Sequence, residues 1–296
     1  MTQNSQTKQA VVIRALSGAL FVATSVVGYL LLTRGEQSNE VAPVAASDMR
    51  DATLGGLTSL SPPPSASESM KELFGWKPGA EEVKTGPDKL TKAAFSEAFT
   101  LGAGRYFAQF FQSQQILGDG AVNEAHAATV SLSVITYKQI DGAWRIVDKR
   151  IDLTESGAWG QLHEAPVQRI QLSPASFGLL IQEGSIGQGY SDGGKSVLVY
   201  TIDQWHDAGV VQTSASNGGS CETGPKNGES DEYMRACFEY DGKISVDPNA
   251  SGEFPDLLVT KKGTQEGERP NQVMPARSVI FKFINGKYES PSELKI

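Results

Sequence analysis

The stretch Thr129–Ile151, TVSLSVITYKQIDGAWRIVDKRI, decides the fold class of most of this chain. Its first part, Thr129–Tyr137, is rich in β-branched residues and alternates apolar with polar positions, as a half-buried β-strand does. Asp141-Gly142 is a typical two-residue hairpin turn. The run that follows, Trp144–Ile151, is again strand-forming. The stretch therefore predicts a β-hairpin at the centre of a β-rich domain.

Similar patterns fill the C-terminal half of the chain. Many of the 31 glycines sit between apolar runs, which indicates frequent turns. Asp241-Gly242 and Asn285-Gly286 predict two more hairpin turns. Further strands are expected at Val167–Leu172, Gly178–Gln182, Lys195–Ile202, Val210–Thr213, Cys237–Tyr240, Leu257–Thr260, Arg277–Ile284 and Lys287–Tyr288.

The segment before the central hairpin predicts a helix. Asp88 can cap its start, and apolar residues then recur mostly at i+3 and i+4 intervals as far as Leu117. Gly102 and Gly104 would kink or split it. The apolar residues are Leu90, Phe95, Phe99, Phe107, Phe110 and Phe111. The expected fold class is therefore α+β: an exported domain, residues 85–296, made of antiparallel hairpins with one or two helices at its start.

The longest apolar run, Val11–Thr33, predicts a transmembrane helix. Beyond Arg14 it carries no charge and spans about 28 Å at roughly 1.5 Å per residue, close to a hydrocarbon core of about 30 Å. Lys8 and Arg14 favour a cytoplasmic tail, residues 1–10, in a single-pass protein of the inner cell membrane. The alternative is a cleaved signal peptide ending at Val44-Ala45-Ala46. Both interpretations place the rest of the chain in the periplasm or outside the cell.

Composition and charge restrict the partners. Residues 34–84 are rich in Pro, Ser and Ala, with Pro62-Pro63-Pro64 near the centre, and predict a flexible linker. The net charge of −8 argues against nucleic acid. The expected partners are the lipid bilayer, through residues 11–33, and an envelope protein or glycan.

The chain has two cysteines, Cys221 and Cys237. Two cysteines in an exported domain usually form a disulfide. A catalytic thiol is disfavoured because no histidine lies near either cysteine in the sequence. Zinc is disfavoured because none of the three histidines is paired at ligand spacing.

One glycine-rich segment, Gly189–Ser196 (GYSDGGKS), matches two catalytic motifs. It fits both the phosphate-binding pattern G-x-x-x-x-G-K-[ST] and the nucleophile pattern G-x-S-x-G around Ser191. Both motifs need a helix after them, whereas the residues from Val197 onward are strand-forming. We therefore expect a strand-connecting turn without catalytic residues. A hydrolase built on Ser191 would need His163 or His206 as its base.

A second segment, Asp247–Val259 (DPNASGEFPDLLV), alternates oxygen-bearing side chains up to a glycine and then enters a strand. It resembles the calcium loop of FG-GAP repeats, the integrin-α-like or VCBS-type family. The resemblance implies a hairpin loop and a bound calcium ion. The sequence predicts no other cofactor. The implied ligands are Asp247, Asn249, Ser251 and Asp256. The loop departs from the pattern by an extra residue before Asp256 and by Ser251 in place of Asp.

More broadly, the C-terminal part resembles uncharacterised exported bacterial proteins of β-rich build. The shared features are a Pro-Asp-Leu strand entry, the step Gly263-Thr264 and the final hairpin Phe281–Tyr288. The expected function is binding or scaffolding in the cell envelope, including inhibition of an exported partner. The alternative is a membrane-anchored extracytoplasmic hydrolase. A flat or grooved surface with exposed aromatics would favour the first, and a cluster of His and carboxylates in a deep pocket would favour the second.

Overall fold

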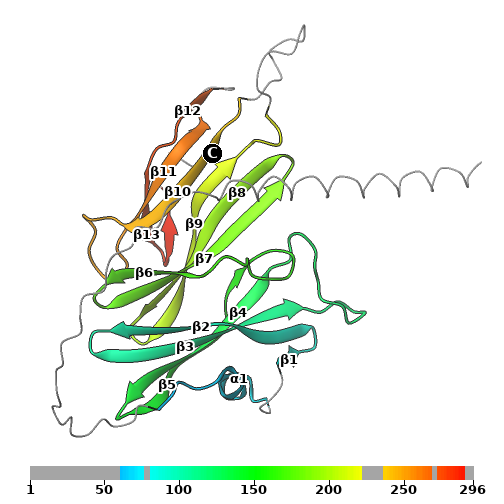
Figure 1. The fold of residues 1–296 in the computed structure, drawn as a ribbon, viewed down its shortest axis with the longest axis vertical. Helices are drawn as coiled ribbons and strands as arrows, with labels where there is room; N and C mark the ends of the chain where they lie inside the picture. The colour runs from blue at the N-terminus through cyan, green and yellow to red at the C-terminus, as the bar shows by residue number, and fades with distance from the viewer. Residues whose placement is uncertain (1–60, 77–80, 222–235, 269–271, 291–296) are drawn as a thin grey trace, which may run out of the picture. The chain divides into compact units, whose positions relative to one another are not determined.

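The computed structural model describes residues 61–76, 81–221, 236–268 and 272–290. They belong to the second of two compact units, Leu57–Ile296. These residues form two antiparallel sheets and one helix (Figure 1). The expected α+β class is therefore wrong, because the domain is built from strands with a single short helix.

The predicted membrane segment, Val11–Thr33, lies outside the described residues, as do the tail 1–10 and the signal-peptide site Val44–Ala46. In the part that is described, no helix is long and apolar enough to cross a membrane. The location of the chain and its topology therefore stay predictions.

The first sheet is a meander of five strands in chain order. Each strand pairs antiparallel with the next. The strands are β1 (Glu82–Gly86), β2 (Lys89–Leu101), β3 (Gly104–Gln115), β4 (Val130–Ile140) and β5 (Ala143–Ser156).

The helix expected over residues 88–117 is thus wrong, since β2 and β3 occupy this segment. Nearly all of β3 is buried on both faces. Tyr106 and Phe110 pack toward the second sheet, and Phe107 and Phe111 pack toward the helix. A strand buried on both faces loses its two-residue alternation, so its aromatic spacing imitated a helix. Gly102, at a φ of 54°, makes the turn between the strands.

The second sheet has nine strands in the order β14-β13-β11-β10-β9-β8-β7-β6, with β12 paired to β11. The strands are β6 (Gln168–Ser173), β7 (Ser176–Gly187), β8 (Tyr190–Thr201), β9 (Gln204–Ser216), β10 (Glu239–Val246), β11 (Leu257–Glu266), β12 (Val273–Pro275), β13 (Val279–Ile284) and β14 (Lys287–Glu289).

Three apolar clusters hold the domain together. The first lies between the sheets and joins side chains such as Phe110 and Leu132 to Leu179 and Tyr200. The second packs β7, β8 and β9 against β11, β13 and β14, so the second sheet curls over itself. The third joins the helix to the outer face of β3 and β4. Strand β8 is consequently buried on both faces along Val197–Tyr200.

The only helix among the described residues, α1 (Ala66–Phe74), lies within the range 34–84 that the composition predicted to be a flexible linker. Ser65 and Glu68 form a reciprocal capping box at its start. Gly75 ends it in the left-handed conformation, at a φ of 77°. Met70 and Leu73 are buried against the first sheet. The segment from Ser65 to Trp76 therefore belongs to the folded domain.

The hairpin predictions have mixed outcomes. The hairpin at Thr129–Ile151 is confirmed, with Asp141 at a φ of 51° and Gly142 at 80°. The turn at Asn285-Gly286 is also confirmed. The turn at Asp241-Gly242 is wrong, because both residues lie inside β10. A Cβ at Gly242 would come within 2.8 Å of Val259 and 2.9 Å of the Thr213 carbonyl oxygen, so strand crowding requires this glycine.

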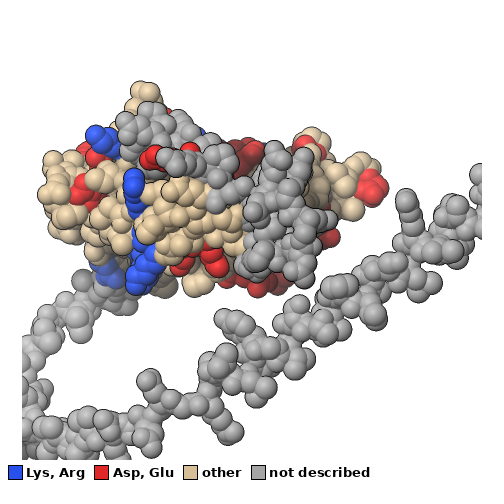
Figure 2. All heavy atoms as spheres, turned by 90° about the horizontal axis from the view of Figure 1, so that it is seen from above, with Lys and Arg blue, Asp and Glu red and all other residues tan. Residues whose placement is uncertain are grey.

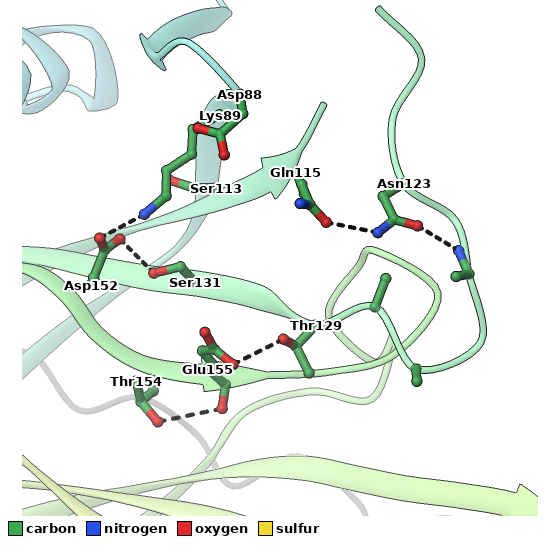
Figure 3. Close-up of a pocket in the computed structure, with 13 residues that line it drawn as sticks. Asp88, Lys89, Ser113, Gln115, Asn123, Thr129, Ser131, Asp152, Thr154 and Glu155 are labelled. Carbon is green, nitrogen blue, oxygen red and sulfur yellow. Dashed lines mark hydrogen bonds and ion pairs between the residues drawn. The ribbon is translucent and has the colours of Figure 1, made fainter. Parts of the chain in front are cut away.

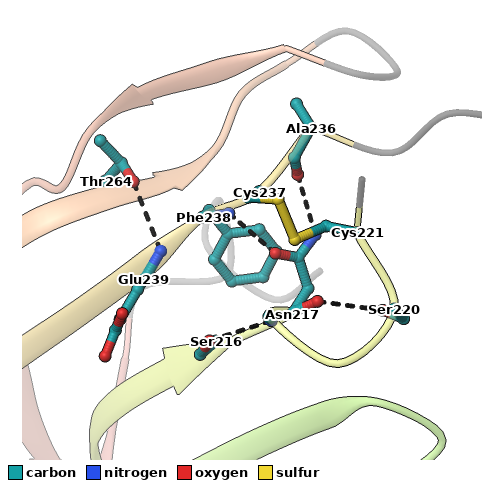
Figure 4. The surroundings of a disulfide bond; sticks show 10 residues. Ser216, Asn217, Ser220, Cys221, Ala236, Cys237, Phe238, Glu239 and Thr264 are labelled. Carbon is teal, nitrogen blue, oxygen red and sulfur yellow. Dashed lines mark hydrogen bonds between the residues drawn. A yellow bond between two sulfur atoms is a disulfide. The ribbon is translucent and has the colours of Figure 1, made fainter. Parts of the chain in front are cut away.

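The disulfide between Cys221 and Cys237 is confirmed, with the two Cα atoms 5.0 Å apart (Figure 4). Asn217 supports it from the end of β9. The Asn217 side chain donates to the Ala236 carbonyl oxygen at 2.8 Å and accepts the Phe238 N–H at 2.7 Å. The disulfide and this amide together fasten the entry of β10 to the end of β9.

Candidate binding site

A groove of about 760 Å³ lies between the loop that follows β5 and the part of β7 and β8 nearest their connecting turn. Its apolar lining comes from Trp159, Leu162 and Ile186, of which Trp159 is 54% exposed and Ile186 72% exposed. Its polar lining includes His126, His163, Glu164, Glu183, Ser191 and Asp192. The groove is thus a surface with an exposed aromatic ring rather than an enclosed cavity.

Glu183 on β7 holds the groove's loop in place. Its carboxylate accepts the Gly157 N–H at 3.0 Å and the Ser196 hydroxyl at 2.5 Å, and it also accepts the Ser156 hydroxyl. Both serines are buried. One carboxylate therefore ties the end of β5 and the following loop to β7 and β8, with hydrogen bonds to a charged acceptor that are stronger than neutral ones.

Two glycines let the chain turn tightly between Ser156 and Gln161. Gly157 has a φ of 82° and Gly160 a φ of 69°. A Cβ at Gly157 would lie 2.1 Å from the Gln161 carbonyl oxygen, and one at Gly160 would lie 2.3 Å from that of Asn123. The Gly160 N–H also donates to the Ala128 carbonyl oxygen at 2.8 Å. Larger residues would not fit at either position.

Trp159 stands between these glycines and is presented to solvent. Its φ of 58° lies in the left-handed region, which is uncommon for a bulky residue. Its indole packs edge-to-face against His126, with ring centroids 4.8 Å apart. A rigid loop that displays a large aromatic side chain is a typical feature of binding surfaces.

We expect Glu183→Gln to lower the free energy of unfolding by about 1–3 kcal/mol, because a neutral amide replaces a charged acceptor of three hydrogen bonds. Urea unfolding measures this change. Glu164→Gln is the matched control, since Glu164 lines the same groove and is exposed. The control should change stability by less than about 0.5 kcal/mol. Equal effects of the two substitutions would contradict the role given to Glu183.

A polar pocket of about 610 Å³ lies beside β2 to β5 (Figure 3). Lys89 pairs with Asp152 at 2.6 Å, and the Ser131 hydroxyl donates to the same carboxylate at 2.5 Å. Burial alone would raise the pKa of Asp152, but these hydrogen bonds and the Lys89 charge outweigh it and hold the pKa below its ordinary value. Asn123 and Thr129 line this pocket, and His126 from the same loop lines the groove. The two sites therefore share one loop.

The glycine-rich segment is confirmed to lack a following helix, because Tyr190–Thr201 is strand β8. Its turn lies earlier than predicted, at Gln188 and Gly189, whose φ values are 51° and 82°. Lys195 is inside β8, where its ammonium donates to the Gln182 amide oxygen at 2.6 Å and burial lowers its pKa. This geometry lacks the helix N-terminus that a phosphate site needs.

Ser191 lines the groove together with His163. Within the described part of the chain, however, no hydrogen bond joins Ser191 to a histidine. His163 instead accepts the Ala165 N–H at 3.1 Å. His206 lies against Phe254, with ring centroids 5.5 Å apart, and burial followed by the charge of Arg150 lowers its pKa. The arrangement does not form the nucleophile–base pair that serine hydrolysis requires.

The four calcium candidates lie in one hairpin loop between β10 and β11. The Asp247 carboxylate accepts the backbone N–H of Asn249 at 3.0 Å and its side-chain amide at 3.2 Å. The Asp247 N–H donates to the Asp256 carbonyl oxygen at 2.9 Å. Ser251 is exposed and follows the same turn. The described residues contain no group of three or more His, Cys, Asp and Glu side chains placed to hold a metal. Calcium binding stays a prediction.

Sequence reasoning did not identify Trp159 and Glu183 as site residues. The sequence Gly-Ala-Trp-Gly at residues 157–160 carries a signal for Trp159, since two glycines around an aromatic residue predict a tight turn that displays it. Glu183 has no such signal, because its partners come from distant strands. No protein-family model matches the chain, and no curated protein and no solved structure matches it significantly.

Proposed function

We propose that this chain is an extracytoplasmic binding or scaffolding protein, held at the membrane through residues 11–33, whose partner occupies the groove beside Trp159. The apolar segment, the confirmed disulfide and the linker composition support the compartment. The groove supports binding as the activity.

The exposed Trp159 is the observation that carries this proposal. Part-buried hydrogen bonds to the Glu183 carboxylate and two sterically required glycines hold its loop, so little conformational entropy is lost when a partner covers the indole. An exposed tryptophan in a preformed groove is among the most common anchors of a protein interface. Scaffolding, capture or inhibition of a partner would all use such a site.

Photo-crosslinking in intact cells tests the proposal. A photoreactive amino acid at position 159 should give a discrete crosslinked product. The matched control is position 202, since Ile202 is also in a left-handed turn, at a φ of 49°, and is 74% exposed. Position 202 does not line the groove. The same products from both positions, or none from 159, would contradict the groove as the binding site.

The second candidate function is hydrolysis. The observation that favours it is the shared groove of Ser191, His163 and Asp192. Covalent labelling of Ser191 by a fluorophosphonate, lost in Ser191→Ala, would support a hydrolase. We give binding precedence because Ser191 has no hydrogen bond to a histidine in the described residues.

A further inference from the structure

Strand β7 has an open edge along the groove. On one side it pairs with β8 over its whole length, from Ser176 to Gly187. On the other side β6 pairs with it only as far as Leu180. Figure 1 shows β6 beside one end of β7, while the β7–β8 hairpin continues beyond it. For the described residues, no strand pairs with this edge from Gly184 to Gly187.

The chain before β6 leaves β7 rather than extending the pairing. Leu162, His163 and Glu164 line the groove, and Pro166, which follows them, has no N–H to donate. Gly184, Ser185, Ile186 and Gly187 are all exposed. Alternate residues of an extended strand direct N–H and C=O groups to each edge. The free edge is therefore a template for one more strand.

The charge around this edge is strongly one-sided. Glu164, Glu183 and Asp192 line the groove, and Asp88, Asp152 and Glu155 line the neighbouring polar pocket. Lys89 is the one Lys or Arg among the described residues that line either site, and it is paired with Asp152. On the face seen in Figure 2, Lys and Arg lie mostly to the left, and Asp and Glu lie both among them and along the lower edge and to the right.

We propose that the groove binds an extended, basic segment of a partner protein, which adds as a strand along Gly184–Gly187. Main-chain hydrogen bonds to β7 supply the alignment, as in other cases of strand addition. An apolar side chain of the segment packs against Trp159 and Ile186, and its Lys or Arg side chains meet Glu164 and Asp192. Opposite charges favour encounter and suppress acidic partners. This inference rests on the proposed function and adds the chemistry of the partner.

Model peptides test the inference with the purified full chain. The probe is the capped, fluorescein-labelled heptapeptide KVKFKVK, and fluorescence anisotropy measures its binding. We expect saturable binding that weakens as salt is added, since surface charge pairs are screened. The acidic counterpart EVEFEVE should bind at least tenfold more weakly. The double variant Glu164→Gln/Asp192→Asn should lose about tenfold in affinity for KVKFKVK, whereas Glu266→Gln, an exposed glutamate on β11, should not change it.

N-methylated peptides separate strand addition from charge attraction. Two versions of KVKFKVK, methylated at odd or at even backbone nitrogens, keep every charge and side chain. Only one of them should lose binding, because only one set of N–H groups faces the edge of β7. Equal affinities of both versions and the parent would overturn strand addition.

Other occupants give different results. Displacement of KVKFKVK by neutral chitotriose, or dimerisation of the chain through residues 184–187, would overturn the basic-segment proposal in favour of a glycan or a second copy. Crosslinks from position 159 without any peptide binding would refute this inference alone and leave the proposed function standing. Absence of those crosslinks, as stated above, refutes the proposed function itself.

Discussion

Trp205→Ala should lower the free energy of unfolding by about 3–5 kcal/mol, as truncation of a large buried aromatic residue does. Trp205 is 1% exposed and lies between the two sheets. Its ring centroid is 5.2 Å from that of Phe110 on the first sheet and 5.2 Å from that of Tyr200 on the second. Its indole N–H donates to the Thr136 hydroxyl at 2.9 Å. Alanine would leave a cavity and an unpaired buried hydroxyl.

Urea unfolding followed by circular dichroism measures this effect. Trp159→Ala is the matched control, because it removes the same side chain from an exposed position. The control should cost less than about 1 kcal/mol in stability while it abolishes partner capture at the groove. A loss below about 1 kcal/mol for Trp205→Ala would mean that the sheets do not pack through this residue.

Removal of the disulfide should lower the free energy of unfolding by about 3 kcal/mol. The two cysteines lie 16 positions apart in the sequence, and a cross-link that closes a loop of this size restricts the unfolded chain by about that amount. The folded ends would keep other ties, because the Asn217 side chain still bridges to Ala236 and Phe238. The variant Cys221→Ser/Cys237→Ser should therefore fold and unfold at lower urea concentration.

Dithiothreitol supplies the control for this prediction. It should lower the unfolding midpoint of the natural chain to that of the double-serine variant and leave the midpoint of the variant unchanged. An identical midpoint for the natural chain with and without the reductant would show that the cross-link does not contribute to stability under those conditions. Peptide binding at the groove should persist in both forms, because Glu183 holds that loop independently.

Local sequence signals determined the β-rich character of the domain, two of its hairpin turns and the disulfide. Asp141-Gly142 and Asn285-Gly286 adopt the left-handed backbone that a two-residue hairpin turn requires, whereas the same signal at Asp241-Gly242 lies within β10. The residues after Lys195 predicted a strand there instead of the helix that both catalytic motifs need, and strand β8 confirms it. The capping box at Ser65 and the terminal Gly75 are local signals that predict helix α1. The linker prediction for residues 34–84 rested on composition and did not include them.

Only the tertiary structure decided that residues 88–117 form strands and that a groove lies beside β7. The β2–β3 segment carries aromatic residues for both of its faces, and only the packing of α1 on one side and the second sheet on the other separates a strand from a helix there. The groove depends on the same long-range contacts. Glu183 reaches Ser156, Gly157 and Ser196 across three strands, and β6 stops short of Gly184. A local sequence pattern specifies the backbone conformation that a segment prefers. The groove and the free edge of β7 depend instead on which distant strands pair and on where that pairing ends.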